Sequence, residues 1–164
     1  MAWCTAAQMN EIGDHGGKRR MQTEFEPEGE WKEELSELAL RREAVRRMGG
    51  TEALERFRAS GRMNARERIA ALVDAGSFRE FGRITGKGRY DDQGRFLALE
   101  PANTVIGTGH IDGRKTALHA DDYTIRAGSS EAAIADKWIY IERMAHQLRL
   151  PLVRLVDSAG GSVK

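Results

Sequence analysis

Apolar positions in residues 31–76 recur at three- and four-residue spacing, a pattern typical of amphipathic helices. A first helix is predicted to begin near the start of this stretch and to end at Gly49-Gly50. A second helix follows Thr51 as its N-cap, and a third covers residues 65–73 behind Asn64 as its cap. This stretch therefore forms a helical N-terminal segment, with a turn behind its third helix.

After the third helix the spacing changes to that of strands. Residues 82–100 are rich in glycine and charge, and they are predicted to form a long loop with one weak strand at 96–99. Two further strands are predicted at 103–109 and 115–120. Asp112-Gly113 between them is a strong hairpin signal, because this dipeptide favours the tight turns that join antiparallel strands.

The last part of the chain alternates a helix with a strand. Ser129 or Ser130 is expected to cap a helix over residues 131–148, which carries one apolar stripe. Residues 152–156 follow as a strand that is apolar on both faces, which predicts burial. A strand, a long helix and a buried strand form a βαβ unit with parallel strands. The fold class is therefore α/β, and residues 77–164 form the α/β part of the chain.

Composition narrows the class of protein. The 164 residues suffice for one domain, and residues 1–30 are polar and Gly-containing, so they are predicted to be a disordered extension without a signal peptide. No apolar run has the length of a membrane span, and the net charge of +1 favours neither nucleic acid nor a membrane as partner. Cys4 is the only cysteine, which excludes an internal disulfide and fits a cytoplasmic protein.

The positive charge is concentrated in residues 41–68, which contain nine arginines and four glutamates. One interpretation is a solvated helical face. The other is that Arg62, Arg66 and Arg68 meet phosphates on a ligand or acidic groups on a partner subunit, because the guanidinium fork donates two hydrogen bonds at once.

Several patterns do not support a nucleotide or metal site. The glycines of residues 107–113 miss the dinucleotide-binding spacing and precede a hairpin instead of a helix. His110, His119 and His146 have no ligand spacing, so we expect no metal. Asp121-Asp122 is better interpreted as a capping or turn pair than as a cation site.

Two small-residue turns are the candidate site. Residues 126–130 precede the predicted helix, and residues 158–162 follow the predicted last strand. Small residues let a backbone approach a ligand closely, and exposed N–H groups attract negative charge. The two turns together fit an oxyanion site that holds an enolate. The alternative interpretation is two ordinary turns.

Five segments in this order resemble the carboxyltransferase (beta) subunits of biotin-dependent acyl-CoA carboxylases, which include the propionyl-CoA, acetyl-CoA and methylcrotonoyl-CoA enzymes. The resemblance covers residues 38–164 and is carried by Gly61-Arg-Met-Asn-Ala-Arg-Glu-Arg-Ile69, Asp74-Ala-Gly-Ser-Phe78, Gly107-Thr-Gly-His-Ile-Asp-Gly113, Asp122-Tyr-Thr-Ile-Arg-Ala-Gly-Ser129 and Leu150-Pro-Leu-Val-Arg-Leu-Val-Asp-Ser158.

This resemblance implies a crotonase-like fold and transfer of CO2 from carboxybiotin, on a carrier protein, to the α carbon of an acyl-CoA. It implies that backbone N–H groups of Gly160 and Gly161 hold the thioester enolate, without a metal. It also implies a second loop beside the acyl-CoA pocket. The expected substrate-binding residues are Arg62, Arg66, Arg126, Ala127, Gly128 and Ser129. The implied partners are the biotin carboxylase/biotin carrier (alpha) subunit and further copies of the beta subunit.

The chain departs from the family pattern in two ways. Ala127 stands where a glycine is common, and Gly161 and Ser162 replace the usual Ala-Arg. The family is also much longer, so we expect an N-terminal fragment that is inactive alone and that associates. The alternatives are a non-catalytic module that binds full-length carboxylase subunits, or a related acyl-CoA decarboxylase subunit.

Overall fold

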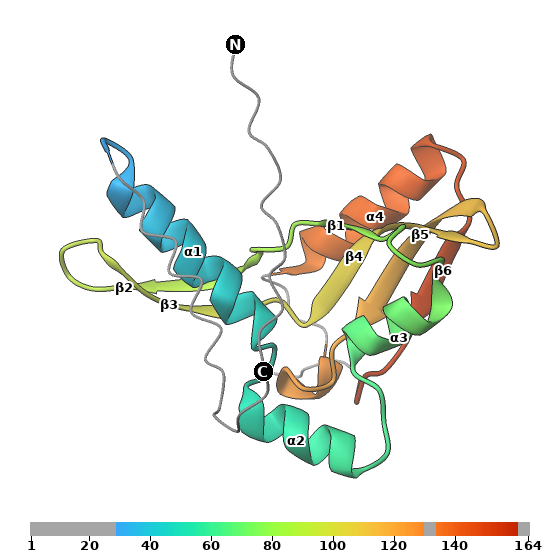
Figure 1. Cartoon of the computed structure of the whole chain (residues 1–164), viewed down its shortest axis with the longest axis horizontal. Helices are drawn as coiled ribbons and strands as arrows, with labels where there is room; N and C mark the ends of the chain where they lie inside the picture. The colour runs from blue at the N-terminus through green and yellow to red at the C-terminus, as the bar shows by residue number, and fades with distance from the viewer. Residues whose placement is uncertain (1–28, 130–133, 161–164) are drawn as a thin grey trace, which may run out of the picture.

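The structure is a computed structural model, and it describes residues 29–129 and 134–160 (Figure 1). Its elements follow in the order α1 Lys32–Arg46, α2 Thr51–Ala59, α3 Ala65–Leu72, β1 Arg79–Phe81, β2 Gly86–Tyr90, β3 Phe96–Pro101, β4 Thr104–Ile111, β5 Arg114–Asp121, the 3₁₀ turn η1 Arg126–Gly128, α4 Ala135–Gln147 and β6 Leu152–Leu155. In the described ranges no helix is both long and apolar enough to cross a membrane.

The main sheet has the strand order β1-β4-β5-β6 within the described residues. β6 pairs with β5 in parallel and the other neighbours pair antiparallel, which confirms the expected βαβ unit around α4. Helix α4 covers one face, where Ile141 packs with Ile106, and α3 covers the other, where Ile69 packs with Leu118 (Figure 1). The sheet therefore separates two small apolar cores, as expected of an α/β fold.

The predicted helices form, with one correction at a cap. Asn64 accepts hydrogen bonds from the N–H groups of Arg66 and Glu67, both at 3.0 Å, and the Glu67 carboxylate accepts the Asn64 N–H at 2.9 Å. This capping box confirms the predicted cap of α3. Gly50, and not Thr51, is the N-cap of α2, because its φ of +94° is one that glycine adopts without strain.

The predicted weak strand at 96–99 is confirmed as part of β3, but the prediction of a loop over the rest of residues 82–100 is wrong. β2 and β3 pair antiparallel from Gly86 opposite Pro101 onward, and α1 lies along this hairpin (Figure 1). The turn closes because Asp91 accepts hydrogen bonds from two N–H groups in the loop, those of Gln93 and Arg95. The polar sequence of β2, Gly-Lys-Gly-Arg-Tyr, hid this strand, since its pairing with β3 orders it more than an alternating apolar face does.

The last strand is correctly placed but is less buried than expected. β6 lies at the edge of the described sheet, its residues are half-buried or exposed, and Val156 behind it is 69% exposed. Full burial is therefore the wrong prediction, because an edge strand has a neighbour on one side only. The predicted extension, the Ser130 cap, the first turn of the 131–148 helix, and Gly161 with Ser162 lie outside the described residues.

A charged cluster at the β1 edge of the sheet comprises Arg66, Glu80, Arg83 and Lys137. Lys137 and the Glu80 side chain are buried in it, Arg66 is half-buried and Arg83 is exposed. The Glu80 side chain is 2% exposed, and Arg66 pairs with it through both terminal nitrogens, at 2.6 and 3.0 Å. Arg83 adds a third contact at 3.1 Å. Burial alone would raise the pKa of Glu80, but the hydrogen bonds and charge of Arg66 hold it below its usual value. Burial lowers the pKa of Lys137 to about 8.

We expect Lys137→Met to make the protein more stable at pH 7 by about 1–2 kcal/mol, because a buried ammonium is costly to desolvate. The pKa of Lys137 is about 8 when folded and 10.5 in its ordinary state. Between these values the unfolded chain binds more protons, so the unfolding free energy of the wild type should rise with pH through this window. Urea denaturation at pH 7, 8, 9 and 10 measures both effects.

The exposed Lys115 offers a matched control, because Lys115→Met removes a lysine charge at the surface. The control should keep the wild-type pH dependence, whereas the Lys137 variant should lose the rise above pH 8. An identical pH dependence in all three proteins would contradict the buried ammonium.

Candidate functional site

The two turns predicted from the sequence lie against each other. The N–H of Ala159 donates to the carbonyl of Ala127 at 2.9 Å, and this bond joins the segment after β6 to the 3₁₀ turn η1. Gly128 has φ +65°, and a Cβ on it would overlap the Asp157 carbonyl oxygen. A glycine is thus required at this contact for two reasons, the backbone angle and the lack of space.

Backbone strain is concentrated in the η1 turn. Arg126 and Ala127 have φ of +49° and +51°, in the left-handed region that residues with a Cβ seldom adopt. The turn is closed by the Gly128 N–H, which donates to the Ile125 carbonyl at 3.0 Å. Ala127 stands where a glycine was expected, and it adopts the glycine-like conformation at a cost of about 1–2 kcal/mol.

A cavity of about 240 Å³ opens beside the docked turns. Gly128, Ser158 and Gly160 line it from the turns, and Trp138 and Ile134 line it from the side of α4. Val156 adds a further apolar group, and the remaining lining is polar: Asn103, Thr104, His119, Asp121 and Arg154. An apolar wall with a few polar groups is typical of a small-molecule site.

His119 is the least expected member of this lining, since it is only 3% exposed. Its Nε2 lies 3.1 Å from an Asp121 carboxylate oxygen, and its Nδ1 has no hydrogen-bond partner in the described part of the chain. Burial acts to raise the pKa of Asp121, but hydrogen bonds from His119 and from the Asp157 N–H hold it below its usual value. Asp121 is therefore an ionised carboxylate, and it accepts a hydrogen bond from the Nε2–H of His119.

The Gly160 N–H, the expected oxyanion donor, already has a partner within its own turn. It donates to the Ser158 hydroxyl oxygen at 3.1 Å. Because a serine hydroxyl rotates freely and Ser158 is exposed, a ligand oxygen can take its place without moving the backbone. The second expected donor, Gly161, lies outside the described residues.

The three arginines singled out in the sequence are all engaged with the protein. Arg62 pairs with Asp157, and Arg66 pairs with Glu80, remote from the cavity lining. Arg68 donates to the carbonyls of Leu155 at 3.2 Å and Asp121 at 2.5 Å. These are contacts within one chain, and binding of substrate by Arg62 and Arg66 stays a prediction.

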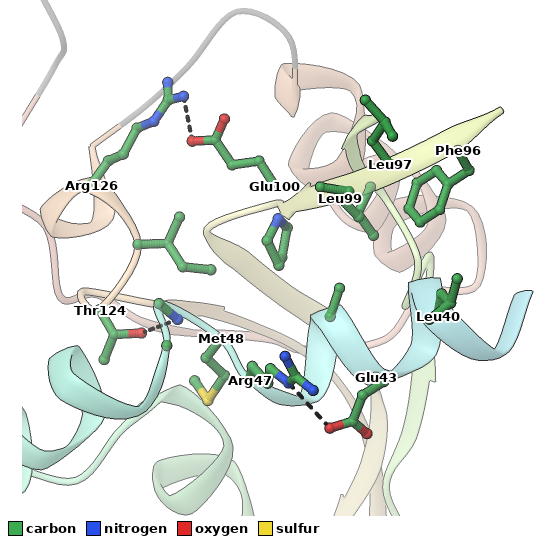
Figure 2. Close-up of a pocket in the computed structure, with 16 residues that line it drawn as sticks. Leu40, Glu43, Arg47, Met48, Phe96, Leu97, Leu99, Glu100, Thr124 and Arg126 are labelled. Carbon is green, nitrogen blue, oxygen red and sulfur yellow. Dashed lines mark hydrogen bonds and ion pairs between the residues drawn. The ribbon is translucent and has the colours of Figure 1, made fainter. Parts of the chain in front are cut away.

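Arg126 faces a different hollow. Its guanidinium pairs with Glu100 at the edge of a hollow of about 560 Å³ between α1, β3 and the Thr124–Arg126 segment (Figure 2). The lining is largely apolar, with Leu40, Met48 and Leu99 among its side chains. Ser129 lies between the two regions, and its carbonyl accepts a hydrogen bond from the Asn103 side chain. Substrate contacts of residues 126–129 likewise stay predictions.

Of the aspartate pair at the end of β5, Asp122 has the turn role expected of the pair, whereas Asp121 contacts His119 and the Asp157 N–H instead. Asp122 accepts the N–H of Thr124 at 3.0 Å and its hydroxyl at 2.6 Å. Burial raises the pKa of this carboxyl above its usual value. Among the described residues there is no group of three or more His, Cys, Asp or Glu side chains that could hold a metal ion.

His119 and Asp157 belong to the site but were not predicted from the sequence. A signal existed for His119, which occupies a core-facing position of a strand, since a buried histidine needs a partner. Asp157 was quoted only as part of a motif. Its contacts depend on how distant segments meet, which local spacing does not contain.

Residues 56–164 match the carboxyl transferase domain family. The propionyl-CoA carboxylase beta chain of Cereibacter sphaeroides is 36% identical over 140 residues, which are 81% of this chain and 26% of that protein. The methylmalonyl-CoA decarboxylase subunit alpha of Veillonella parvula is 35% identical over 121 residues, 73% of this chain and 24% of that protein. The chain thus spans about a quarter of the length of these relatives.

Solved structures agree with the fold. The transcarboxylase 12S structure with hydrolyzed methylmalonyl-coenzyme A bound has a TM-score of 0.65 and 30% identity, over 77% of this chain and 25% of that one. The beta subunit of geranyl-CoA carboxylase from P. aeruginosa has a TM-score of 0.63 at 23% identity, over 87% and 28%. The expected crotonase-like fold is confirmed by these similarities.

Proposed function

The chain belongs to the carboxyl transferase domain family, and from this premise we propose that it supplies the acyl-CoA-binding part of a carboxyltransferase. The two docked turns hold the thioester, and the Gly160 N–H donates to its carbonyl oxygen. That oxygen gains negative charge when the α C–H bond breaks and the thioester becomes an enolate. The α carbon of the enolate then forms the new C–C bond to the CO2 that leaves carboxybiotin when its N–C bond breaks, and the α proton replaces the CO2 on that nitrogen.

The observation that carries this proposal is the contact between the turns, the Ala159 N–H bonded to the Ala127 carbonyl beside a partly polar cavity. A fixed backbone donor stabilises an enolate because it is already oriented when the charge develops. Gly160 is suited to this task, since its present acceptor is a hydroxyl that can rotate away. Gly161, predicted as the second donor, completes the proposed pair.

The proposed substrate is a CoA thioester, and carboxybiotin enters as a second substrate on a partner protein. Relatives are propionyl-CoA, methylcrotonoyl-CoA and acetyl-/propionyl-CoA carboxylase beta chains, which supports an acyl-CoA and leaves the acyl group open among them. We further propose a biotin carboxylase/biotin carrier subunit and other copies of the beta subunit as partners, in the cytoplasm. The transcarboxylase 12S neighbour is a hexamer, in support of self-association.

Decarboxylation of a malonyl-type thioester is the second candidate. It is favoured by the 35% identity to a methylmalonyl-CoA decarboxylase subunit alpha. Loss of CO2 from such a thioester leaves its bonding electrons on the same enolate, so the same backbone donor serves both reactions.

Isothermal titration of the chain with propionyl-CoA and with propyl-CoA, its thioether analogue, tests the proposal. The thioether lacks the carbonyl oxygen, so we expect the thioester to bind about tenfold more tightly. Ser158→Ala should increase the preference for the thioester over the thioether further, because the Gly160 N–H then no longer donates to the Ser158 hydroxyl. Failure of both ligands to bind at millimolar concentration would contradict the proposal and favour a non-catalytic interaction module.

A further inference from the structure

The guanidinium of Arg62 lies against two aromatic rings and a carboxylate. Its guanidinium carbon lies 4.6 Å from the ring centre of Phe57 and 4.7 Å from that of Tyr123. These two rings are themselves stacked, with centres 5.8 Å apart. The same guanidinium pairs with the carboxylate of Asp157. Aromatic rings and a carboxylate thus fix the cation together, a geometry suited to arginine.

Asp157 in turn joins four parts of the site. Its N–H donates to an Asp121 carboxylate oxygen at 3.2 Å, which ties it to the end of β5. Its carbonyl oxygen lies so close to Gly128 that a Cβ at position 128 would overlap it. Arg68 approaches its carboxylate at 3.7 Å, beyond hydrogen-bond distance. Gly160 follows three positions later in the chain, so the orientation of Asp157 sets that of the candidate donor.

Stability is not what the Arg62–Asp157 contact chiefly provides. The Arg62 side chain is 45% exposed, and a pair with one such exposed member contributes little to folding. The Asp157 side chain is only 13% exposed, so it depends on Arg62 for a close charged partner. Removing Arg62 is therefore expected to disturb the local orientation of Asp157 more than the fold.

Building on the function proposed above, we propose that Arg62 is a positioning residue, which fixes Asp157 and thereby aims the Gly160 N–H at the thioester oxygen. Arg62 then acts through the protein instead of binding the phosphates of the coenzyme. Only one terminal nitrogen of the guanidinium pairs with Asp157, so a phosphate contact through its other N–H groups is a separate role, which would strengthen the binding of every coenzyme ligand alike.

Titration of Arg62→Met with three ligands separates these roles. Methionine keeps an unbranched apolar stem over the rings and removes the charge. For a positioning residue, the preference for propionyl-CoA over propyl-CoA should fall from about tenfold to less than about twofold, while propyl-CoA binds as to the wild type. A contact to phosphate would instead weaken both coenzyme ligands alike and leave propionyl-pantetheine, which lacks the nucleotide, unchanged. That second result would overturn the inference.

Three further variants test the interpretation. Asp157→Asn should lose the same preference, and the double variant should lose no more than either single one, because the two residues act as one unit. Arg58→Met is the control, since Arg58 pairs with Glu67 on an exposed surface, and it should keep the wild-type preference.

The outcomes also separate this inference from the function on which it rests. Wild-type protein that binds none of the ligands contradicts the proposed function, and the inference with it. Wild-type thioester preference that survives in both Arg62→Met and Asp157→Asn overturns only the positioning role.

Discussion

Replacing Arg66 by methionine is expected to lower the unfolding free energy by about 3 kcal/mol, because it leaves the buried carboxylate of Glu80 without its two-pronged partner. Arg83 and Lys137 remain near Glu80, but neither side chain can form both of the hydrogen bonds that Arg66 donated to the carboxylate. Urea denaturation at pH 7, followed by circular dichroism, measures the loss.

The pH dependence of this loss has a definite sign. In the wild type the pKa of Glu80 lies below its usual value, so its stabilising contribution is present above pH 4.5 and is lost as the pH falls through the folded pKa. In the variant, burial without Arg66 favours the protonated acid. The difference between the two proteins should therefore shrink below about pH 4.5.

Arg58→Met is again the matched control, because its partner Glu67 lies in an exposed pair and the change should cost less than about 1 kcal/mol. Replacing Arg66, Glu80 and Lys137 together by methionine should recover most of the stability, since the exposed Arg83 is then the only charge left in the cluster. Equal losses in the Arg66 and Arg58 variants would contradict a buried pair.

Gly128→Ala is expected to have the largest effect on ligand binding. The new Cβ overlaps the Asp157 carbonyl oxygen, so the two turns must separate. We expect propionyl-CoA to bind at least about tenfold more weakly, with about 1–3 kcal/mol of lost stability from overlap and backbone strain. Titration with propionyl-CoA and urea denaturation of the same samples check both values.

A control for strain alone is available in the β2–β3 hairpin. Gly94 has φ +78°, and nothing lies within 4 Å of a Cβ placed there. Gly94→Ala should therefore cost a comparable backbone strain but leave propionyl-CoA binding unchanged. Binding lost equally in both variants would mean that the contact between the turns has no part in it.

The elements that could be predicted from sequence are those with strong local signals. Asn64 predicts the start of α3, where it forms a capping box, and Asp112-Gly113 predicts the turn between β4 and β5. In the β2–β3 hairpin only β3 had a weak signal, because β2 is polar and gains its order from pairing with β3. Lys137 shows a milder failure: it lies four residues before Ile141 on the buried face, where the spacing favours an apolar side chain.

The candidate site was predictable in its turns but not in its contacts. The small residues around Gly128 and Gly160 marked both turns, and their docking agrees with the prediction of one site. The partners of the arginines were not predictable, because Arg62 and Asp157 lie 95 positions apart and meet only in the folded chain. The sequence shows that Arg62 is charged, but local spacing does not show which carboxylate it contacts.

The parallel pairing of β6 with β5 has a consequence for the order of folding. β4 and β5 meet across a tight turn, whereas β6 pairs only after the connection through α4 has been closed. Closing that longer loop costs more chain entropy, so this pairing is expected to form after the hairpin. Since the segment from Asp157 to Gly160 follows β6, a refolding chain would acquire its β4–β5 hairpin early and its ligand-binding turn among its last structures.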